Sequence, residues 1–250
     1  LGLQAIRVTP ADTDTCAYDL GTRASRMTYI VGEAVRKAAL ALDLAIRDVA
    51  ALALNAAPQD LTLQRGGVQS ARTRISLADL ATWLAARNTA LPIATQTHRA
   101  TANPGSFAAH FAEVEVDTLT GRVQVTEYLA AHDIGRAINP MLVEGQIHGG
   151  IQIGLGYALY EDVAVDPGTG RLRGDSFARY TLANAPEMPP IRALLVEKVE
   201  PTGPFGAKAV GEIATVAVAP ALVNAVNAAL GTRLTDLPLL PERIIQALQN

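Results

Sequence analysis

The sequence predicts an α+β protein in which mixed sheets pack against helices. Between about residues 30 and 54, apolar residues recur at intervals of three and four, as on one face of an amphipathic helix. Residues 111–117 and 122–128 instead alternate between apolar and polar side chains about a short turn, as a β-hairpin does. Strands and helices do not follow one another in a regular βαβ order, so α+β is favoured over a doubly wound α/β fold.

The first part of the chain is expected to hold a strand, a helix, a hairpin, a second helix and a loop, at residues 5–9, 30–54, 61–70, 77–86 and 89–108. A glycine pair at 66–67 supplies the positive φ angles that a tight hairpin turn needs. Ser76, with Asp79 three residues later, has the pattern of a helix N-cap. Between the strand and the first helix, the polar residues 11–21 favour a loop.

The second part is expected to hold a β-hairpin, a helix, an extended segment, a strand and two further helices, at residues 111–128, 139–160, near 163, 194–199, from 211 and from 241. The helix over 139–160 is unusual because it contains the glycines Gly145, Gly149, Gly150, Gly154 and Gly156. Each glycine costs a helix interior about 1 kcal/mol relative to alanine. We therefore expect another group to approach the backbone of this helix closely.

Composition places the chain among soluble globular proteins. Its 21 Lys and Arg against 24 Asp and Glu give a net charge of −3, and 49% of its 250 residues are hydrophobic. Disordered and low-complexity chains are excluded by this balance, and a nucleic-acid-binding protein would be expected to be basic. No uninterrupted apolar run reaches about 18 residues, so we expect no membrane span. The length suits one large domain or two small ones.

The single cysteine, Cys16, limits the redox chemistry that the chain can carry. One thiol cannot form an internal disulfide, and it cannot supply the four thiolates of an iron–sulfur cluster. The four histidines lack the spacing of a zinc site. A redox centre must therefore be a bound cofactor or lie on another chain. Because the chain begins with Leu-Gly-Leu, we interpret it as an interior piece whose strand at 5–9 lacks its neighbour.

Two segments are candidates for binding an anion. Residues 202–212 place a loop of small residues before a helix start and carry one carboxylate there, Glu212. Free amide groups at a helix N-terminus attract anions, although Glu212 is equally an ordinary acid of a first helical turn. Residues 21–28 offer hydroxyls to a phosphate, or simply an N-cap for the helix that follows. Gln146 suits the edge of a heterocycle, or a bridge between two strands.

Other catalytic signatures are missing. The chain contains no Gly-x-Ser-x-Gly, no Walker A motif and no Gly-x-Gly-x-x-Gly after a strand. Serine hydrolysis and phosphoryl transfer by a P-loop therefore lose most of their support.

Three segments together resemble the C-terminal part of the molybdenum-cofactor subunit of the xanthine dehydrogenase and aldehyde oxidase family. They are Ala-Ser-Arg-Met-Thr-Tyr-Ile-Val-Gly-Glu-Ala-Val at 24–35, Asp-Ile-Gly-Arg-Ala-Ile-Asn-Pro at 133–140 leading to Glu-Gly-Gln at 144–146, and Gly-Ala-Lys-Ala-Val-Gly-Glu at 206–212. Their order and spacing extend the resemblance almost from end to end. The same mixed α+β fold is implied, with residues 1–108 as the end of a first molybdopterin-binding domain and 109–250 as the second.

The resemblance implies a role for each candidate. Glu212 matches the family's catalytic glutamate, the base that takes a proton from the hydroxyl that attacks an electrophilic carbon of the substrate. A buried carboxylate has a raised pKa and is a stronger base, which suits that role. The cofactor-binding residues that the resemblance implies are Ala24, Ser25, Thr28, Gln146, Lys208 and Gly211. Molybdenum would be held through the pterin and not by a side chain, and the glycine-rich helix would pack close to this cofactor.

The family also implies partners. Its first cofactor motifs and its substrate-gripping loops lie in an N-terminal half that is missing here, so we expect a second molybdopterin-binding chain to supply them. Iron–sulfur clusters and FAD are expected on separate subunits, and the cofactor is expected to be molybdopterin in its cytosine dinucleotide form. Residues 12–26 favour the branch with 4-hydroxybenzoyl-CoA reductase and purine hydroxylases.

The implied reaction is oxidation, or reductive dehydroxylation, of an aromatic heterocycle, an aldehyde or an aryl thioester. The alternative is a noncatalytic assembly or cofactor-binding subunit that kept the fold. The scarcity of cysteine fits the cytoplasm, and export within a folded complex stays open.

Overall fold

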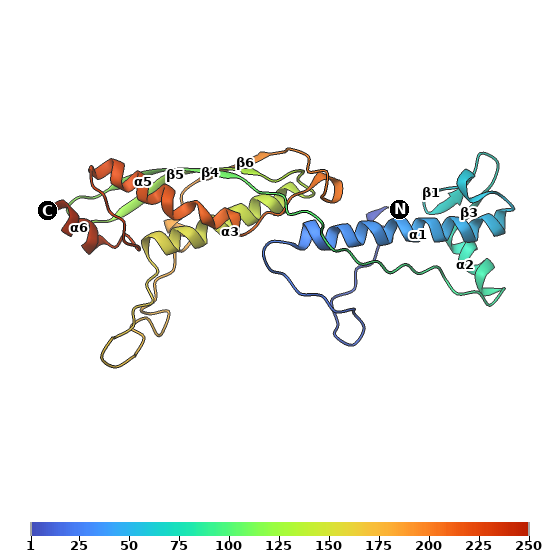
Figure 1. Ribbon diagram of the computed structural model, residues 1–250, viewed down its shortest axis with the longest axis horizontal. Coiled ribbons are helices and arrows are strands. Elements are labelled where there is room, and N and C mark those ends of the chain that lie inside the picture. The colour runs from blue at the N-terminus through green and yellow to red at the C-terminus, as the bar shows by residue number, and fades with distance from the viewer. Residues whose placement is uncertain (1, 250) are drawn as a thin grey trace. The chain divides into compact units, whose positions relative to one another are not determined.

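The computed structural model describes residues 2–249 and has the α+β fold that the sequence predicts (Figure 1). The chain forms two compact units, one of Leu1–Arg23 with Ile30–Thr101 and one of Ala24–Tyr29 with Ala102–Asn250. These units divide at residues 101–102, near the approximate division at 108–109 that the sequence suggests, and the assignment of two molybdopterin-binding domains stays a prediction. In addition, the short segment 24–29 belongs to the second unit although it lies within the sequence of the first.

The first unit is built around one long helix and a small sheet. Its elements are α1 (Gly32–Leu54), β1 (Thr62–Gln64), β2 (Gly67–Gln69), β3 (Arg74–Ser76) and α2 (Leu77–Ala85). The strands pair antiparallel in the order β1-β2-β3. As predicted, the Ser76 hydroxyl caps α2 by accepting the Asp79 N–H at 3.0 Å. Leu61, Val68 and Leu80 are at most 3% exposed and form the core against α1.

Two local predictions in this unit were wrong. Residues 3–5 form a 3-10 turn, and residues 6–9 form no strand. Ile6 is 55% and Val8 is 85% exposed, because no described strand of this chain lies beside them. The positive φ angles of the hairpin turn belong to Arg65 and Gly66, not to the glycine pair. The sequence also missed β3, which is too short to show alternation.

The second unit places helices against one face of a mixed sheet. Its strands are β4 (Ala108–Val116), β5 (Val123–Asp133) and β6 (Ile191–Val196), and its helices are α3 (Pro140–Leu159), α4 (Ile213–Val216), α5 (Val218–Leu230) and α6 (Pro241–Gln249). β4 and β5 form the predicted antiparallel hairpin. β6 begins earlier than expected and pairs parallel with β5, so α3 is the crossover between two parallel strands.

The glycines of α3 do not all have the same surroundings. A Cβ at Gly150 would lie 2.5 Å from the Cβ of Ala214, and a Cβ at Gly154 would overlap Val218. At these two positions the close approach is between α3 and the helices α4 and α5, not with a cofactor. At Gly145 and Gly149 an added Cβ would meet nothing within 4 Å. Of the five glycines in α3, only Gly145 and Gly149 thus have free space beside them.

The stretch Ile213–Leu230 is, within the described residues, long and apolar enough by length and composition to cross a membrane. Its residues Ala214, Val218, Leu222 and Val226 are all 0% exposed and belong to the core of the second unit. Packing against α3 and the sheet accounts for these four apolar positions, while 28% of the whole stretch is buried.

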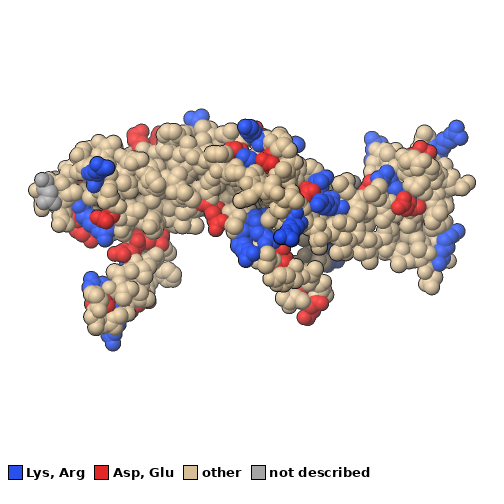
Figure 2. Space-filling view, in the orientation of Figure 1, with Lys and Arg blue, Asp and Glu red and all other residues tan. Residues whose placement is uncertain are grey.

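A long loop over residues 161–182 projects from the second unit between α3 and β6 (Figures 1 and 2). Acidic and basic side chains lie together on it, with Arg173 3.5 Å from Asp166 and Arg179 3.4 Å from Asp175. Exposed ion pairs of this kind stabilise a loop only weakly.

Candidate functional site

Three segments that are distant in sequence meet at Glu212. The Ser25 hydroxyl accepts the Glu212 N–H at 2.9 Å and donates to the Glu212 carboxylate at 3.3 Å. A Cβ at Gly211 would lie 2.6 Å from the Ser25 Oγ and 3.5 Å from the Gln146 Oε1. Ser25, Gln146, Gly211 and Glu212 thus form one group, which we call the Glu212 cluster. All four belong to the second unit.

The segment that carries Ser25 is held in a strained conformation. Ala24 and Ser25 have φ angles of 48° and 53°, in the left-handed region that is unfavourable for residues with a Cβ. Such residues cost on the order of 1 kcal/mol or more each and persist only where their surroundings fix them. Here Tyr29 supplies part of that anchor, because it is 6% exposed and its hydroxyl lies 2.6 Å from the Thr202 Oγ1.

The loop before Glu212 is fastened to the end of β5. The Lys208 N–H donates to the Ile134 carbonyl and the Arg136 N–H donates to the Gly206 carbonyl, both at 2.9 Å. Gly135 has a φ of 66°, and a Cβ there would lie 2.7 Å from the Lys208 nitrogen. Only glycine fits this position, so two of the three segments that carry the family resemblance are joined directly to each other.

Lys208 makes the second link between the loop and β5. Its ammonium is 2.7 Å from the Asp133 carboxylate and 3.0 Å from the Gly105 carbonyl, and the two side chains are 9% and 14% exposed. Burial alone would raise the pKa of the Asp133 carboxyl, but hydrogen bonds from Lys208 and the Gly135 N–H outweigh it and lower that pKa. The described contacts of the Lys208 ammonium are therefore structural, and a cofactor contact by this residue stays a prediction.

The remaining candidates face solvent. Gln146 lies on the exposed side of α3, so the alternative that it bridges two strands was wrong. Ala24 and Thr28 are also exposed. Glu212 is exposed as well, and it directly precedes α4 without a capping bond from its side chain. The burial that the sequence argument assumed for this carboxylate is thus not provided by the described residues.

Comparison with known proteins decides the family. A model of the molybdopterin cofactor-binding domain matches residues 1–189, which is more than half of the chain and runs across the boundary between the two units. The chain belongs to the molybdopterin-binding subunits of the xanthine dehydrogenase family. The resemblance drawn from the three segments is therefore confirmed.

Two curated relatives show how far this likeness extends. The xanthine dehydrogenase molybdenum-binding subunit of Escherichia coli O157:H7 is 34% identical over 246 residues, which are 96% of this chain and 33% of that protein. The nicotine 6-hydroxylase large subunit of Paenarthrobacter nicotinovorans is 33% identical, over 98% of this chain and 31% of its own length. The chain thus spans about a third of these relatives.

Solved structures agree with this assignment. Quinoline 2-oxidoreductase from Pseudomonas putida 86 is similar with a TM-score of 0.79 and 32% identity, over 95% of this chain and 32% of that one. CO dehydrogenase from Oligotropha carboxidovorans has a TM-score of 0.82 and 28% identity, over 95% of this chain and 31% of that one. Molybdenum-containing enzymes therefore share the α+β fold described above.

The donor set of the Glu212 cluster fits molybdopterin. Gln146 carries an exposed amide that both donates and accepts, as a pterin edge requires. On the same helix, the open positions at Gly145 and Gly149 leave room for a flat ring system to approach. Near the cluster, Thr28 adds an exposed hydroxyl that can donate to a phosphate oxygen, whereas the proton of the Ser25 hydroxyl is already donated to Glu212. Among residues 2–249 no group of three or more His, Cys, Asp or Glu could hold a metal ion directly.

A second polar cluster lies on the inward face of β4 and β5 and was not identified from the sequence. His110 Nε2 is 2.9 Å from His132 Nε2, and His110 Nδ1 is 2.9 Å from the Tyr128 hydroxyl. Burial and the neighbouring His132 lower the pKa of His110 to about 4, and burial also lowers the pKa of His132. All three residues occupy inward positions of the hairpin, but His110 and His132 lie beyond the alternating stretches 111–117 and 122–128 from which it was predicted.

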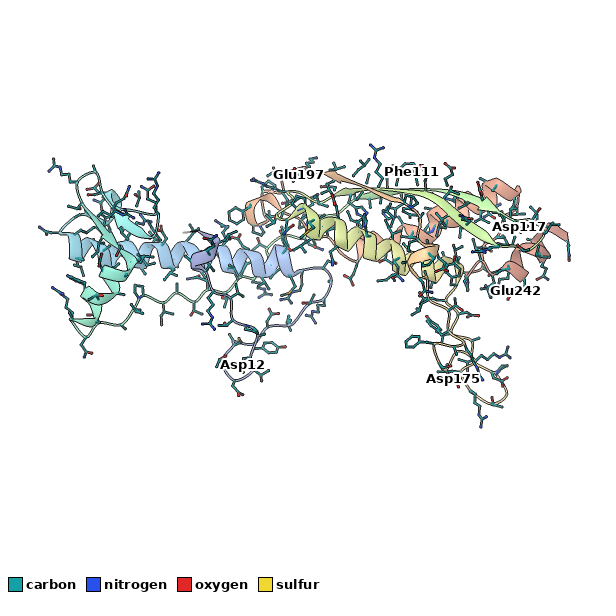
Figure 3. The ribbon with its side chains drawn as sticks, turned by 180° about the vertical axis from the view of Figure 1, so that it is seen from behind. Asp12, Phe111, Asp117, Asp175, Glu197 and Glu242 are labelled. Carbon is teal, nitrogen blue, oxygen red and sulfur yellow. The ribbon has the colours of Figure 1, made fainter. Side chains whose placement is uncertain are left out.

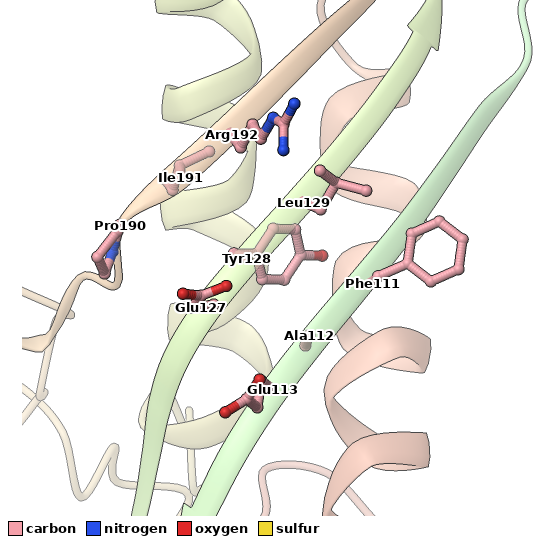
Figure 4. Close-up of a pocket in the computed structure, with 9 residues that line it drawn as sticks. All are labelled: Phe111, Ala112, Glu113, Glu127, Tyr128, Leu129, Pro190, Ile191 and Arg192. Atoms are coloured by element: carbon pink, nitrogen blue, oxygen red, sulfur yellow. The ribbon is translucent and has the colours of Figure 1, made fainter.

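The outer face of the sheet bears a hollow of about 530 Å³ (Figure 4). Phe111, Leu129 and Arg192 line it, and Glu113 lies directly opposite Glu127 across the two strands. None of its lining residues belongs to the Glu212 cluster. The hollow is therefore not the candidate site.

Proposed function

We propose that this chain is one part of a molybdopterin-dependent hydroxylase and that Glu212 is its general base. The observation that supports this most directly is the Glu212 cluster, in which a helix, a loop and a strained turn bring Gln146, Glu212 and Ser25 together. A carboxylate beside a pterin-sized set of donors is the arrangement that proton removal next to this cofactor requires.

Different residues of this chain would bind the cofactor and accept the proton. Gln146 binds the edge of the pterin, while the Thr28 hydroxyl and the backbone at Ala24 and Ser25 bind its substituents. Two-electron redox chemistry is what a bound molybdenum centre supplies. Glu212 accepts the proton at its carboxylate, and general-base catalysis of this kind contributes about 10²- to 10⁴-fold to a rate.

The substrate class that we propose is an aromatic nitrogen heterocycle. Support comes from relatives whose names specify nicotine and quinoline. An aldehyde or an aryl thioester is less well supported by these names. We further propose the cytosine dinucleotide form of the cofactor, which is large enough to use all of the cofactor-binding candidates, and a cytoplasmic location.

Relatives that are named as subunits support a proposal about partners. We propose that a second molybdopterin-binding chain completes the site. Iron–sulfur and FAD subunits would then carry the electrons away, because the chain's single cysteine cannot ligate a cluster.

Replacing Glu212 by glutamine in the isolated native assembly tests the proposal. Reduction of an artificial electron acceptor with quinoline or nicotine as substrate should fall by about 10²-fold or more, because the amide cannot accept the proton. Molybdenum content, measured by elemental analysis, should stay the same. Glu242→Gln is the matched control, because Glu242 is also exposed but lies far from the family segments. Glu197 marks the end of the second unit where those segments lie, since its carboxylate accepts the N–H of Ala137 in the segment 133–140. Glu242 lies at the opposite end of that unit (Figure 3).

The result also separates the two classes of function. An unchanged rate in Glu212→Gln would reject the catalytic assignment and favour the noncatalytic assembly subunit. An assembly with neither molybdenum nor partner chains would reject both the hydroxylase and the proposed complex.

A further inference from the structure

We infer that Ser25 is a positioning residue that holds the Glu212 carboxylate through its hydroxyl. The family resemblance gives Ser25 only a cofactor contact, so this role is additional to it. The catalytic consequence rests on the proposed function of Glu212, whereas the structural link between the two residues does not.

The hydroxyl is used in both directions at once. It accepts the Glu212 N–H at 2.9 Å and donates to the carboxylate of the same residue at 3.3 Å. A serine hydroxyl has one donor and two acceptor sites, so the two bonds do not compete. The first bond holds the backbone of Glu212, and the second holds its carboxylate. The link closes a distance of 187 residues in the sequence.

Gly211 makes this link possible. A Cβ at that position would lie 2.6 Å from the Ser25 Oγ and 3.1 Å from the Ser25 Cβ. Any larger residue would push the hydroxyl away from Glu212. The role of Gly211 that these distances indicate is therefore to admit Ser25, in addition to the cofactor contact that the resemblance implies.

The backbone of Ser25 points to the same conclusion. Ala24 and Ser25 are consecutive left-handed residues with φ angles of 48° and 53°, although neither is a glycine. An ordinary helix N-cap has an extended backbone and needs no such strain. The capped residue here, moreover, is not on the helix that follows Ser25 in the chain. The strained turn directs the hydroxyl to a different segment, which is the pattern of a functional constraint.

The link matters because Glu212 is exposed. A free glutamate side chain populates several rotamers, and fixing it costs up to about 2 kcal/mol of conformational entropy. A hydroxyl that already restrains the carboxylate removes part of this cost before the reaction begins, as preorganised groups do. Loss of the restraint should therefore slow the step that uses the carboxylate and leave substrate binding unchanged.

The first test measures the backbone half of the link, the bond from the Glu212 N–H to the Ser25 hydroxyl. In the purified chain, in whichever assembly it is isolated, Ser25→Ala should speed hydrogen exchange of the Glu212 amide about five- to tenfold, since a hydrogen bond contributes about 1 kcal/mol. Ser106→Ala is the matched control. Ser106 is also half-buried and its hydroxyl donates to the Ala209 carbonyl of the same loop at 3.3 Å, yet it does not contact Glu212. Unchanged exchange of the Glu212 amide in Ser25→Ala would overturn the inference.

The second test measures its consequence in the molybdenum-containing assembly. Ser25→Ala should lower kcat about 10- to 100-fold, while KM and molybdenum content stay the same. Ser25→Gly should lose rate as well, because it relieves the strained backbone but also lacks the hydroxyl. In the Glu212→Gln background, Ser25→Ala should have no further effect, since residues that act through one another are not additive.

Each other outcome decides against the inference. A loss of molybdenum in step with activity would mean that the Ser25 hydroxyl retains the cofactor and does not position the base. A full further loss in the Glu212→Gln background would show that Ser25 acts independently of Glu212. If Glu212→Gln alone left the rate unchanged, the proposed function would fail, and the exchange of the Glu212 amide would still decide whether the link exists.

Discussion

His110 and His132 show how two neutral rings are kept together inside this fold. Their Nε2 atoms are 2.9 Å apart, a distance at which one ring donates and the other accepts. Two protonated rings could not remain there, because both nitrogens would then be donors. His132 Nδ1 is also buried without a hydrogen-bond partner, so the fold offers nothing to stabilise a charge at that atom. The native state therefore cannot hold both rings protonated at once.

This pair predicts acid lability of the second unit. The pKa of His110 falls from 6.5 to about 4 on folding, so between these values the unfolded chain binds more protons than the native one. Stability should then decrease as the pH falls from about 6.5 to about 4, by on the order of 2 kcal/mol, since one pKa unit is worth about 1.4 kcal/mol and solvent screens part of it. Urea denaturation at pH 7.5, 5.5 and 4.5 measures this change.

Substitution separates this effect from general acid denaturation. His110→Gln should flatten the pH dependence, because glutamine forms hydrogen bonds without taking up a proton. His148→Gln is the control, since His148 lies exposed on α3. Equal slopes for the parent chain and His110→Gln would refute the assignment.

At this scale the sequence predicted the residues of the Glu212 cluster better than their contacts. Motif order was enough to select Glu212, Gln146 and Ser25. The bond between Ser25 and Glu212 could not be predicted, because it depends on a left-handed turn at residues without glycine. The exposure of Glu212 was likewise unpredictable from a local pattern.

Among the elements, α3 carries two kinds of glycine that the sequence cannot distinguish. Gly149 and Gly150 are neighbours, yet an added Cβ meets open space at the first and Ala214 at the second. Helical periodicity predicted the position of α3 well, since it runs from Pro140 to Leu159. Which glycine faces which neighbour depends on how α4 packs, and that is not a local property. For the same reason, the sequence placed the start of β6 three residues late. It also predicted a strand at 5–9, where the structure has none.

Opposite effects of alanine at these neighbouring positions are expected. Gly149→Ala should stabilise the chain by about 1 kcal/mol, because alanine is the better helix former and meets no obstruction. Gly150→Ala should destabilise it by about 1–3 kcal/mol, because its methyl group would overpack against Ala214. Urea denaturation monitored by circular dichroism measures both. Equal shifts in one direction would contradict the packing of α3 against α4.

For the whole molecule, the exposed side of α3 is expected to be covered by another component of the assembly. Met141, Ile153 and Tyr157 are 71%, 57% and 59% exposed, and they recur at helical spacing with Gly145 and Gly149. An apolar stripe of this kind is rare on a surface that stays in water. The cofactor and second chain proposed above would cover this stripe.

Gly149→Ala should therefore stabilise the isolated chain but weaken the assembly. The added methyl group stabilises the chain in isolation, but it occupies the space that the cofactor or second chain would use beside Gln146. We expect the variant assembly to contain less molybdenum and less of the co-purifying second chain than the parent, as measured by elemental analysis and mass spectrometry. Gly168→Ala is the control, because it adds a methyl group in an exposed turn where the nearest atom is 3.5 Å away. Full molybdenum content in a more stable Gly149→Ala assembly would mean that this side of α3 stays in solvent, and the second chain would then have to bind elsewhere.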